Sequence, residues 1–495
     1  FQPETPEGQT EAPASEILRS HEWDGTSETS PDYELDPETE TEKPGEDGSY
    51  YLLPVEIVPD YNRDGKIDQA DSGKITTEKP WRFWINDDDD SGETEGTDIS
   101  QGAAANDTNG KNSQADGLRD LVDFFPLKLD IKTVLQTLPP ADYYYRLTHS
   151  GTTADPSLRV IQAPELMPLA SSDYLKSMDV AKSMQYEESR AVHAHGPLLE
   201  DDFLAAAEEG EGLLLIEGVK PTTSPIILKI QKKSDGSTVA EIPFQIKISE
   251  IKDMFRYKFV MPGAANLGAG DVPADPPNWP DADRNDKHFV FAHGYNVNDT
   301  QSKGWGGEAF KRLFWSGSNA RFTAFGWYGY QGQTFGITPD YQVNLDNAFG
   351  TAKSFKQFLD LLEGEKTVAG HSMGNVLVGS AMHDWGARPK NYCMLNAAAA
   401  KECYDPAEAD EPAQDAAMEN QIWRGYPKIL RASDWHRLLP PAAWPGSDWR
   451  GQLTWRGRVA NVFQIGGQTD VDSFVSSGED VLDDPTLYTP QSNNG

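Results

Sequence analysis

The sequence predicts a multidomain chain, in which a β-sandwich-like module precedes a domain with a mainly parallel sheet and helices on both faces. Three observations predict this organisation. Residues 49–262 contain short runs of β-branched and aromatic residues, several of them alternating with polar residues. Beyond residue 285, short apolar runs alternate with longer segments of helical spacing, as in α/β sheets. Between them, residues 263–284 are rich in Pro, Gly, Ala and Asp and are predicted to be a linker.

The charge balance restricts the classes of partner. The chain has 79 acidic and 43 basic residues and a formal net charge of −36, which argues against nucleic acid or an anionic membrane surface as a partner. No run of about 18 apolar residues occurs, so no membrane span is expected. The two cysteines, Cys393 and Cys403, cannot build a disulfide framework. This composition favours a cation-rich setting, and we expect a secreted or cell-surface protein.

Residues 1–48 are rich in Glu, Pro, Thr, Ser and Gly and have few large apolar groups to bury. Such a segment is expected to be extended or disordered unless it lies against another surface. The chain opens on Phe1 rather than Met, which indicates processing or an excerpt from something longer.

An oxygen-rich loop follows the first predicted strand, Tyr51–Val58. Residues 60–71 read DYNRDGKIDQAD, with a glycine at position 6 of the loop and an apolar residue at position 8. The predicted ligands are Asp60, Asn62, Asp64, Lys66, Asp68 and Asp71. Because Ca²⁺ prefers six to eight oxygen ligands, this spacing predicts a structural calcium site, with an acidic turn as the alternative. The loop resembles the calcium loops of dockerins and EF-hand proteins.

A second acidic cluster, Asp87–Asp90, follows the aromatic run Trp81–Ile85. Four adjacent carboxylates repel one another unless a cation or water separates them. A further calcium site and a solvated loop are both compatible with this pattern. Asp116, Asp120 and Asp123 either return to the same ion or face water.

The remainder of the module is predicted to consist of short strands, interrupted by an irregular segment at about residues 166–210. Phe124–Ile131 is one such strand, and residues 142–165 contain two more. Pro225–Lys232 and Val239–Ile248 flank the polar turn at 233–238. The second run alternates apolar and polar residues, so the pair is predicted to be a hairpin with one wet face.

The second domain is predicted to run from residue 285 to 495. Its expected strands are His288–Ala292, Arg321–Trp327, Thr367–Ala369 and Tyr392–Leu395. Its expected helices are Glu308–Trp315, Asn344–Leu362 and Asn375–Trp385. Alternation of this kind indicates a mainly parallel sheet with helices on both faces.

Two motifs lie at the ends of predicted strands. In Thr367–Val378, TVAGHSMGNVLV, a short β-branched run ends in a glycine-flanked Ser372, and an apolar helical run follows. This is the pattern of a nucleophile elbow, in which Gly370 and Gly374 stand where a Cβ would collide with a neighbouring element. Upstream, the buried run His288–Ala292 leads directly into His293-Gly294-Tyr295-Asn296.

On these motifs, and on GWYG at Gly326–Gly329, the part of the chain from about residue 285 resembles an α/β-hydrolase of the esterase or lipase type. The resemblance implies that Ser372 is a nucleophile that forms an acyl-enzyme. It also implies that the backbone amides of Met373 and Tyr295 form the oxyanion hole.

The resemblance further implies an acid after a late strand and a histidine after the final one. Asp480, which follows the strand-like run Val471–Val475, is the predicted acid, with Glu479 as the alternative. None of the nine histidines follows Asp480. His436 is the candidate base, in a position that departs from the family order. Otherwise the base lies beyond residue 495, in a C-terminally incomplete domain, or has been lost.

Residues 401–458 contain five tryptophans and are predicted to form a lid, which either binds an acyl chain or a sugar or only covers the sheet edge. Two hypotheses follow. The first is an extracellular serine esterase acting on an ester or lipid-like small molecule. The second is a non-catalytic structural or adhesive component of a calcium-stabilised extracellular assembly, with other subunits as partners, which retains a hydrolase fold.

Overall fold

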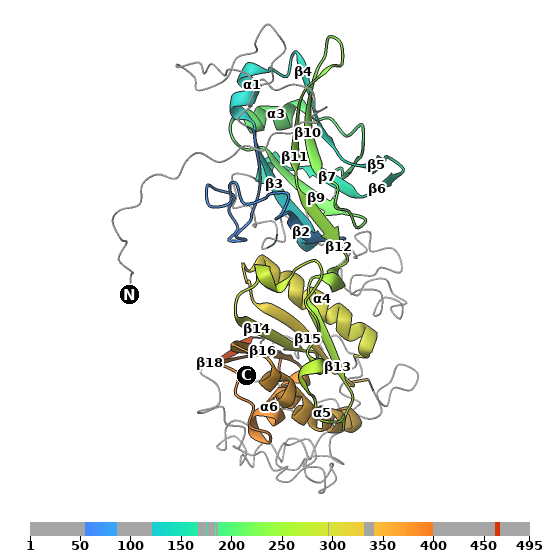
Figure 1. Ribbon diagram of the computed structural model, residues 1–495, viewed down its shortest axis with the longest axis vertical. Coiled ribbons are helices and arrows are strands. Elements are labelled where there is room, and N and C mark those ends of the chain that lie inside the picture. The colour runs from blue at the N-terminus through green and yellow to red at the C-terminus, as the bar shows by residue number, and fades with distance from the viewer. Residues whose placement is uncertain are drawn as a thin grey trace, which may run out of the picture. The chain divides into compact units, whose positions relative to one another are not determined.

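The computed structural model describes residues 55–86, 121–166, 175, 184, 187–295, 297–330, 341–398 and 461–465. The chain divides into two compact units, with the change between them at residues 248 and 249 (Figure 1). Residues 55–86 and 123–248 are the described parts of the first unit, and residues from 249 onward form most of the second. Within the described residues, no helix is both long enough and apolar enough to cross a membrane.

The first unit is rich in antiparallel strands. Its largest sheet has the order β1 (Glu56–Pro59), β3 (Phe124–Asp130), β9 (Leu213–Gly218), β7 (Leu158–Gln162) and β8 (Arg190–Val192). A second sheet has the order β11 (Thr238–Phe244), β10 (Ile226–Lys232) and β4 (Tyr143–Thr148). Two strand pairs are β12 (Ile246–Ser249) with β2 (Trp81–Trp84) and β5 (Gly151–Thr152) with β6 (Asp155–Pro156). The helices are α1 (Lys132–Thr137) and α3 (Asp201–Glu208).

Alternating burial explains why these runs form strands. In β10, Ile226, Leu228 and Ile230 are buried, whereas the residues between them are half-exposed. β10 and β11 form the hairpin predicted from the sequence, and Gly236 in its turn has a φ of +74° that favours glycine. Phe83 packs edge-on against Phe125 of β3, with 5.1 Å between ring centroids. The core of this unit therefore joins β2 to the largest sheet.

The segment at about residues 166–210 is not an irregular insertion throughout. Part of it, Arg190–Val192, is strand β8, which pairs with β7 at the edge of the largest sheet. Another part, Asp201–Glu208, is helix α3, which buries Phe203 and Leu204. The sequence predicts residues 198–209 to be helical or irregular, and the structure has α3 there, with Phe203, Leu204 and Ala207 buried.

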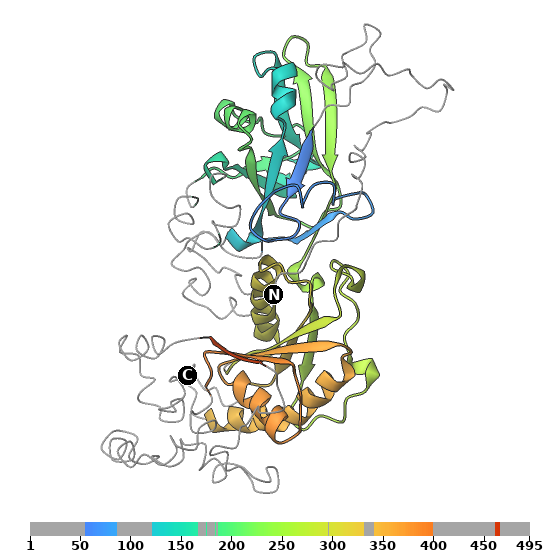
Figure 2. The ribbon, with the colours of Figure 1, turned by 90° about the vertical axis from the view of Figure 1, so that its left-hand side faces the viewer.

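The second unit contains a six-stranded sheet in which every neighbouring pair is parallel (Figure 2). The strands in spatial order are β13 (Arg256–Val260), β15 (Arg321–Trp327), β14 (Lys287–Ala292), β16 (Glu365–His371), β17 (Asn391–Leu395) and β18 (Asn461–Ile465). The carboxyl ends of β14 and β16 lie side by side, since Ala292 is paired with Gly370.

Helices cover both faces of this sheet (Figure 2). Phe322 of β15 contacts Phe310 of α4 (Asp299–Trp315), with ring centroids 5.7 Å apart. Phe325, on the opposite face of the same strand, lies 4.8 Å from Phe355 of α5 (Tyr341–Leu361). α6 (Gly374–His383) shares its buried core with α5.

Short 3-10 helices occur in both units, at Leu121–Asp123, Pro164–Leu166, Ile251–Asp253, Ala269–Asp271 and Asp281–Asp283.

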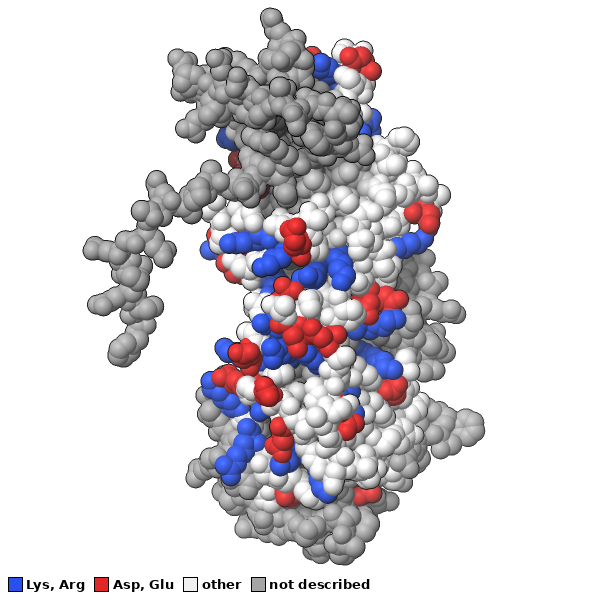
Figure 3. Space-filling model, in the orientation of Figure 1, with Lys and Arg blue, Asp and Glu red and all other residues white. Residues whose placement is uncertain are grey.

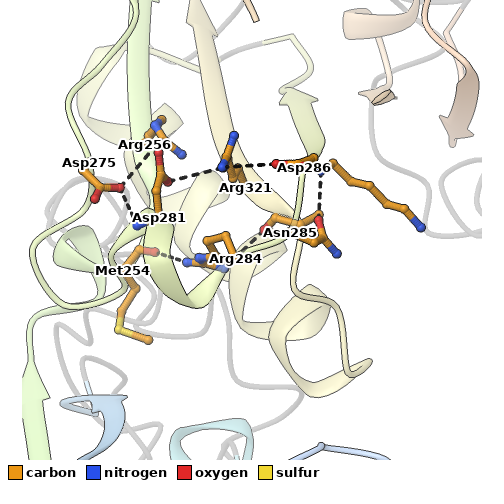
Figure 4. Close-up of polar contacts among 10 residues, drawn as sticks. Met254, Arg256, Asp275, Asp281, Arg284, Asn285, Asp286 and Arg321 are labelled. Atoms are coloured by element: carbon orange, nitrogen blue, oxygen red, sulfur yellow. Dashed lines mark hydrogen bonds and ion pairs between the residues drawn. The ribbon is translucent and has the colours of Figure 1, made fainter. Parts of the chain in front are cut away.

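The predicted linker at 263–284 is wrong, because the strand before it already belongs to the second unit. β13 pairs with β15 along its whole length, so residues 263–284 connect two strands of one sheet. Two ion pairs also hold residues 263–284 to the sheet (Figure 4). Arg256 of β13 pairs with Asp281, and its Nη2 lies 3.5 Å from Asp275 Oδ1. The predicted second domain, starting at residue 285, therefore begins too late.

Charges of both signs lie interspersed on the face drawn in Figure 3, without a large patch of one sign. The acidic excess is concentrated elsewhere in the chain. Residues 1–48, outside the described part, contain fifteen acidic and two basic residues. These residues contribute −13 (15 acidic minus 2 basic) to the net charge of −36.

We expect two neighbouring glycines of α4 to respond oppositely to alanine. A Cβ on Gly306 would lie 2.4 Å from Ala324 Cβ, whereas the nearest atom to one on Gly307 would be Ile251 Cγ1, at an ordinary contact distance of 3.5 Å. Gly306→Ala should therefore lower the free energy of unfolding by about 1–3 kcal/mol through overpacking. Gly307→Ala should raise it by about 0.5–1 kcal/mol, since alanine is the better helix former. Urea unfolding of both variants tests this, and equal effects would contradict the packing of α4 on β15.

Candidate active site

Ser372 lies in a sharp turn at the carboxyl end of β16. The strand ends at His371 and α6 begins at Gly374, so only Ser372 and Met373 connect them. Ser372 has a φ of +49°, a left-handed conformation that costs a non-glycine residue about 1–2 kcal/mol. Strain of this kind persists only where the surrounding structure enforces it, and it is concentrated at functional sites.

Two glycines allow the turn to form. A Cβ on Gly374 would lie 2.5 Å from the carbonyl oxygen of Ala292 and 2.6 Å from that of His293. A Cβ on Gly370 would lie 2.9 Å from Asn375 Oδ1. The first residue of α6 therefore packs directly on the end of β14. Neither position leaves room for a side chain.

The loop after β14 lies against Ser372. A Cβ on Gly294 would stand 2.8 Å from Ser372 Cβ and 2.9 Å from His371 Nδ1. The next residue, Tyr295, is partly buried and packs against the core. The loop after β15 approaches as well, since a Cβ on Gly329 would lie 3.1 Å from the carbonyl oxygen of Gly294. The three predicted motifs therefore meet at one edge of the sheet, where ligands of open α/β sheets commonly bind.

His293 fixes the loop instead of serving as a base. Its buried ring accepts a hydrogen bond at Nε2 from the Trp327 amide (3.1 Å), and Nδ1 donates to the Gly294 carbonyl (2.8 Å). The ring also stacks on Trp327, whose indole N–H donates to the His293 carbonyl. Burial lowers the pKa of His293 to about 4, so the neutral form is held and both hydrogen bonds are preserved.

The other described histidines near the elbow have structural surroundings. His371 stacks on Trp305 of α4, with 5.0 Å between ring centroids. His383, near the far end of α6, contacts Asp384, which also accepts a hydrogen bond from Ser380. Within the described part of the chain, no side chain hydrogen-bonds to Ser372 Oγ. The predicted base His436 and the predicted acids Asp480 and Glu479 lie outside the described residues.

The predicted calcium loop forms a compact turn in the first unit. Asp60 Oδ2 accepts a hydrogen bond from the Gly65 amide (2.9 Å), and Gly65 has a φ of +91°. Asp71 accepts from the amides of Asn62 and Asp68, each at 3.0 Å. The amide of Asp64 donates to Asn62 Oδ1, and that of Lys66 to Asp64 Oδ1. Position 6 of the loop is thus the bend that the pattern requires.

Asp60 is the carboxylate of this loop that has one unsatisfied oxygen. It is 1 % exposed, and its Oδ1 has no hydrogen-bond partner among the described residues. Burial, with contributions from Asp71 and Asp64, raises its pKa to about 6. The buried Arg63 brings a positive charge close to it. An orphaned carboxylate oxygen beside two further carboxylates fits a hard cation.

The spacing of the loop's side chains fits a metal less well. In the described residues, no three His, Cys, Asp or Glu side chains come close enough together to hold a metal ion. Instead, backbone amides of the loop donate hydrogen bonds to the carboxylates of Asp60, Asp64, Asp68 and Asp71. The cluster Asp87–Asp90, with Asp116 and Asp120, lies outside the described residues. Asp123 is buried and accepts a hydrogen bond from the Trp84 indole.

Comparison with known protein families, curated proteins and solved structures finds no match to this chain. Its site is therefore interpreted from its own geometry. Two residues that contact the elbow, Trp305 and Tyr392, were not predicted from the sequence. Trp305 stacks on His371, and the Tyr392 hydroxyl donates a hydrogen bond to Asn375 Oδ1. Trp305 lies in a glycine-rich helix far from the elbow in sequence, and buried Tyr392 looks like an ordinary strand residue. Neither position carries a local signal.

We expect the second unit to lose stability as the pH falls from about 6.5 toward 4. The unfolded chain then binds a proton that the folded state, with the pKa of His293 lowered to about 4, does not. The contribution present above pH 6.5 is roughly 3 kcal/mol and is lost toward pH 4. His293→Gln should be less stable than the wild type at pH 7 and show a shallower pH dependence. Chemical unfolding across this range tests the expectation, and parallel curves would contradict it.

Proposed function

We propose that this protein is an extracellular serine hydrolase of the esterase or lipase type, with Ser372 as the nucleophile. The observation that carries the proposal is the left-handed Ser372, held between β16 and α6 with Gly294 packed against it. A serine in this position has its hydroxyl at the carboxyl edge of the sheet, where a bound ester would be reached. The α/β-hydrolase fold class belongs to the same proposal, supported by the parallel sheet and the position of the turn.

The proposed reaction has two steps. Ser372 Oγ attacks the ester carbonyl while a base takes its proton. The tetrahedral intermediate then breaks its bond to the alcohol oxygen, which receives that proton from the base, and the acyl-enzyme remains. The amides of Met373 and Tyr295 are the proposed donors to the oxyanion, and each such donor is worth about 3 kcal/mol of the barrier. Water then hydrolyses the acyl-enzyme. His436 is the proposed base and Asp480 the acid that orients it.

Labelling with a fluorophosphonate probe tests the nucleophile. Attack by Oγ forms an O–P bond and breaks the P–F bond, so fluoride and the serine proton are released. In the native full-length protein, we expect one labelled peptide, which contains Ser372, and no labelling after Ser372→Ala. Peptide mapping by mass spectrometry locates the adduct.

Ser380→Ala is the matched control. Ser380 lies on the same helix, is buried, and donates its hydroxyl proton to Asp384. This variant should label as the wild type does. Absence of label from folded, calcium-loaded wild-type protein would overturn the enzyme proposal and leave the non-catalytic one.

We further propose that the loop at 60–71 binds one structural Ca²⁺. The proposed ligands are Asp60, Asn62, Asp64, Asp68 and Asp71, together with the backbone carbonyl of Lys66. The support is the buried, unpartnered Asp60 Oδ1 beside the other carboxylates of the loop. Bound calcium would give Asp60 Oδ1 the partner that it lacks among the described residues.

Calcium titration of thermal unfolding tests this site. Calcium at about one hundred times its dissociation constant should stabilise the wild type by about 2.7 kcal/mol, and Asp60→Asn should abolish this gain. Lys66→Ala, the matched control, keeps the backbone carbonyl and should respond as the wild type does. Without calcium, Asp60→Asn should equal or exceed the wild type in stability, because it removes the cost of burying a carboxylate whose Oδ1 is unpartnered. An equal calcium response in Asp60→Asn would contradict the proposal.

The second candidate function is a non-catalytic component of an extracellular assembly. Its support is the acidic segment 1–48, which is expected to be ordered only where it lies against another surface. In that case the second unit has a structural role only, and it packs against other subunits of the assembly. The labelling experiment separates the two candidates.

A further inference from the structure

The carbonyl oxygen of Ser372 is fixed by three hydrogen bonds. The backbone amide of Asn375 donates to it at 3.1 Å, the side-chain Nδ2 of Asn375 at 2.9 Å, and the amide of Ala398 at 3.1 Å. The Ser372 amide in turn donates to the Leu395 carbonyl at 3.0 Å. The residue is thus held on both sides, by α6 and by the end of β17.

This arrangement determines where the Met373 amide points. No cis peptide bond occurs in the described residues, and in a planar trans peptide the C=O and N–H groups point in opposite directions. Fixing the Ser372 carbonyl toward Asn375 and Ala398 therefore turns the Met373 N–H away from them. Donors fixed before the reaction stabilise a developing charge without reorganisation.

Tyr392 of β17 fixes the orientation of the Asn375 side chain. Its hydroxyl donates to Asn375 Oδ1 at 2.8 Å, and both residues are fully buried. An amide whose oxygen accepts from Tyr392 must present its NH₂ group to the Ser372 carbonyl. Gly370 leaves room for this side chain, since a Cβ there would lie 2.9 Å from Asn375 Oδ1.

We propose that Asn375 is a positioning residue for the oxyanion hole, and that Tyr392 acts through it by fixing its amide. The inference rests on the proposed function, because it assigns a role in the reaction of Ser372. Asn375 touches no reacting atom. It acts by restricting the peptide between Ser372 and Met373 to the one orientation in which its N–H group can meet the oxyanion.

The test uses the full-length protein and two reactions of Ser372. One is turnover of p-nitrophenyl acetate, and the other is phosphonylation by the fluorophosphonate probe, measured as a rate constant per folded molecule. Asn375→Leu, of similar size and without a donor, should lower kcat and the phosphonylation rate roughly 10- to 100-fold, with KM changed less than about 3-fold. Tyr392→Phe, which keeps the ring, should lower both rates about 3- to 10-fold.

Asn391→Ala is the matched control. Asn391 lies next to Tyr392 on β17 and donates its side-chain amide to Thr367 Oγ1 at 2.9 Å, at the opposite end of the paired strands from the elbow. It should lose stability without a change in kcat per folded molecule. If Asn375→Leu does not fold, Tyr392→Phe and the control decide the question.

The two proposals fail in different ways. If the wild type neither turns over the ester nor reacts with the probe at Ser372, the proposed function and this inference both fall. If the wild type reacts and the Asn375 and Tyr392 variants react equally fast per folded molecule, only the inference falls. A rise in KM with an unchanged kcat would also overturn it, because it would place Asn375 in ground-state binding.

Discussion

The second unit depends on the close approach of two backbone segments at the carboxyl ends of β14 and β16. Gly374 lies against the carbonyl groups of Ala292 and His293, and Gly294 lies against Ser372. Neither approach leaves space for a side chain. The distance between the two strands is set by their hydrogen bonds, so the turn after β16 and the loop after β14 can adopt few other conformations. The left-handed Ser372 is a consequence of this confinement.

The elements around this contact supply rigidity from different parts of the chain. His293 joins the loop after β14 to the end of β15. Asn375, Ala398 and Leu395 join the turn to α6 and β17. The hydrogen bonds of these polar groups are satisfied, and the side chains of His293 and Asn375 are buried. Satisfied buried polar groups specify one arrangement more sharply than apolar packing does. The strain at Ser372 is therefore distributed over a network that includes four neighbouring strands.

Periodicity and motif spacing predicted much of this region. The runs around Ser372, the buried run before His293 and the hairpin of β10 and β11 all carry local patterns that match their structure. The start of α4 was placed too late, at Glu308 instead of Asp299. Gly304, Gly306 and Gly307 weaken the helical signal there, although Gly306 is what lets α4 approach Ala324. β13 was missed as part of the parallel sheet because its partner β15 is more than sixty residues later in the chain. Contacts of this kind leave no periodic trace in the sequence.

β17 and β18 are neighbours in the sheet, yet residues 396–460 lie between them in the chain. The entropic cost of closing a flexible connection rises only with the logarithm of its length, by about 0.6 kcal/mol for each doubling. If a connection of this kind is a flexible chain, the pairing of the strands that it joins depends only weakly on its length. The connection begins after Leu395, the last residue of β17. The Leu395 carbonyl accepts a hydrogen bond from the Ser372 amide, so the connection starts directly beside the elbow. The fold therefore offers a place where chain can be added, removed or exchanged beside Ser372 at little thermodynamic cost, so that the surroundings of the serine can diverge while its scaffold stays the same.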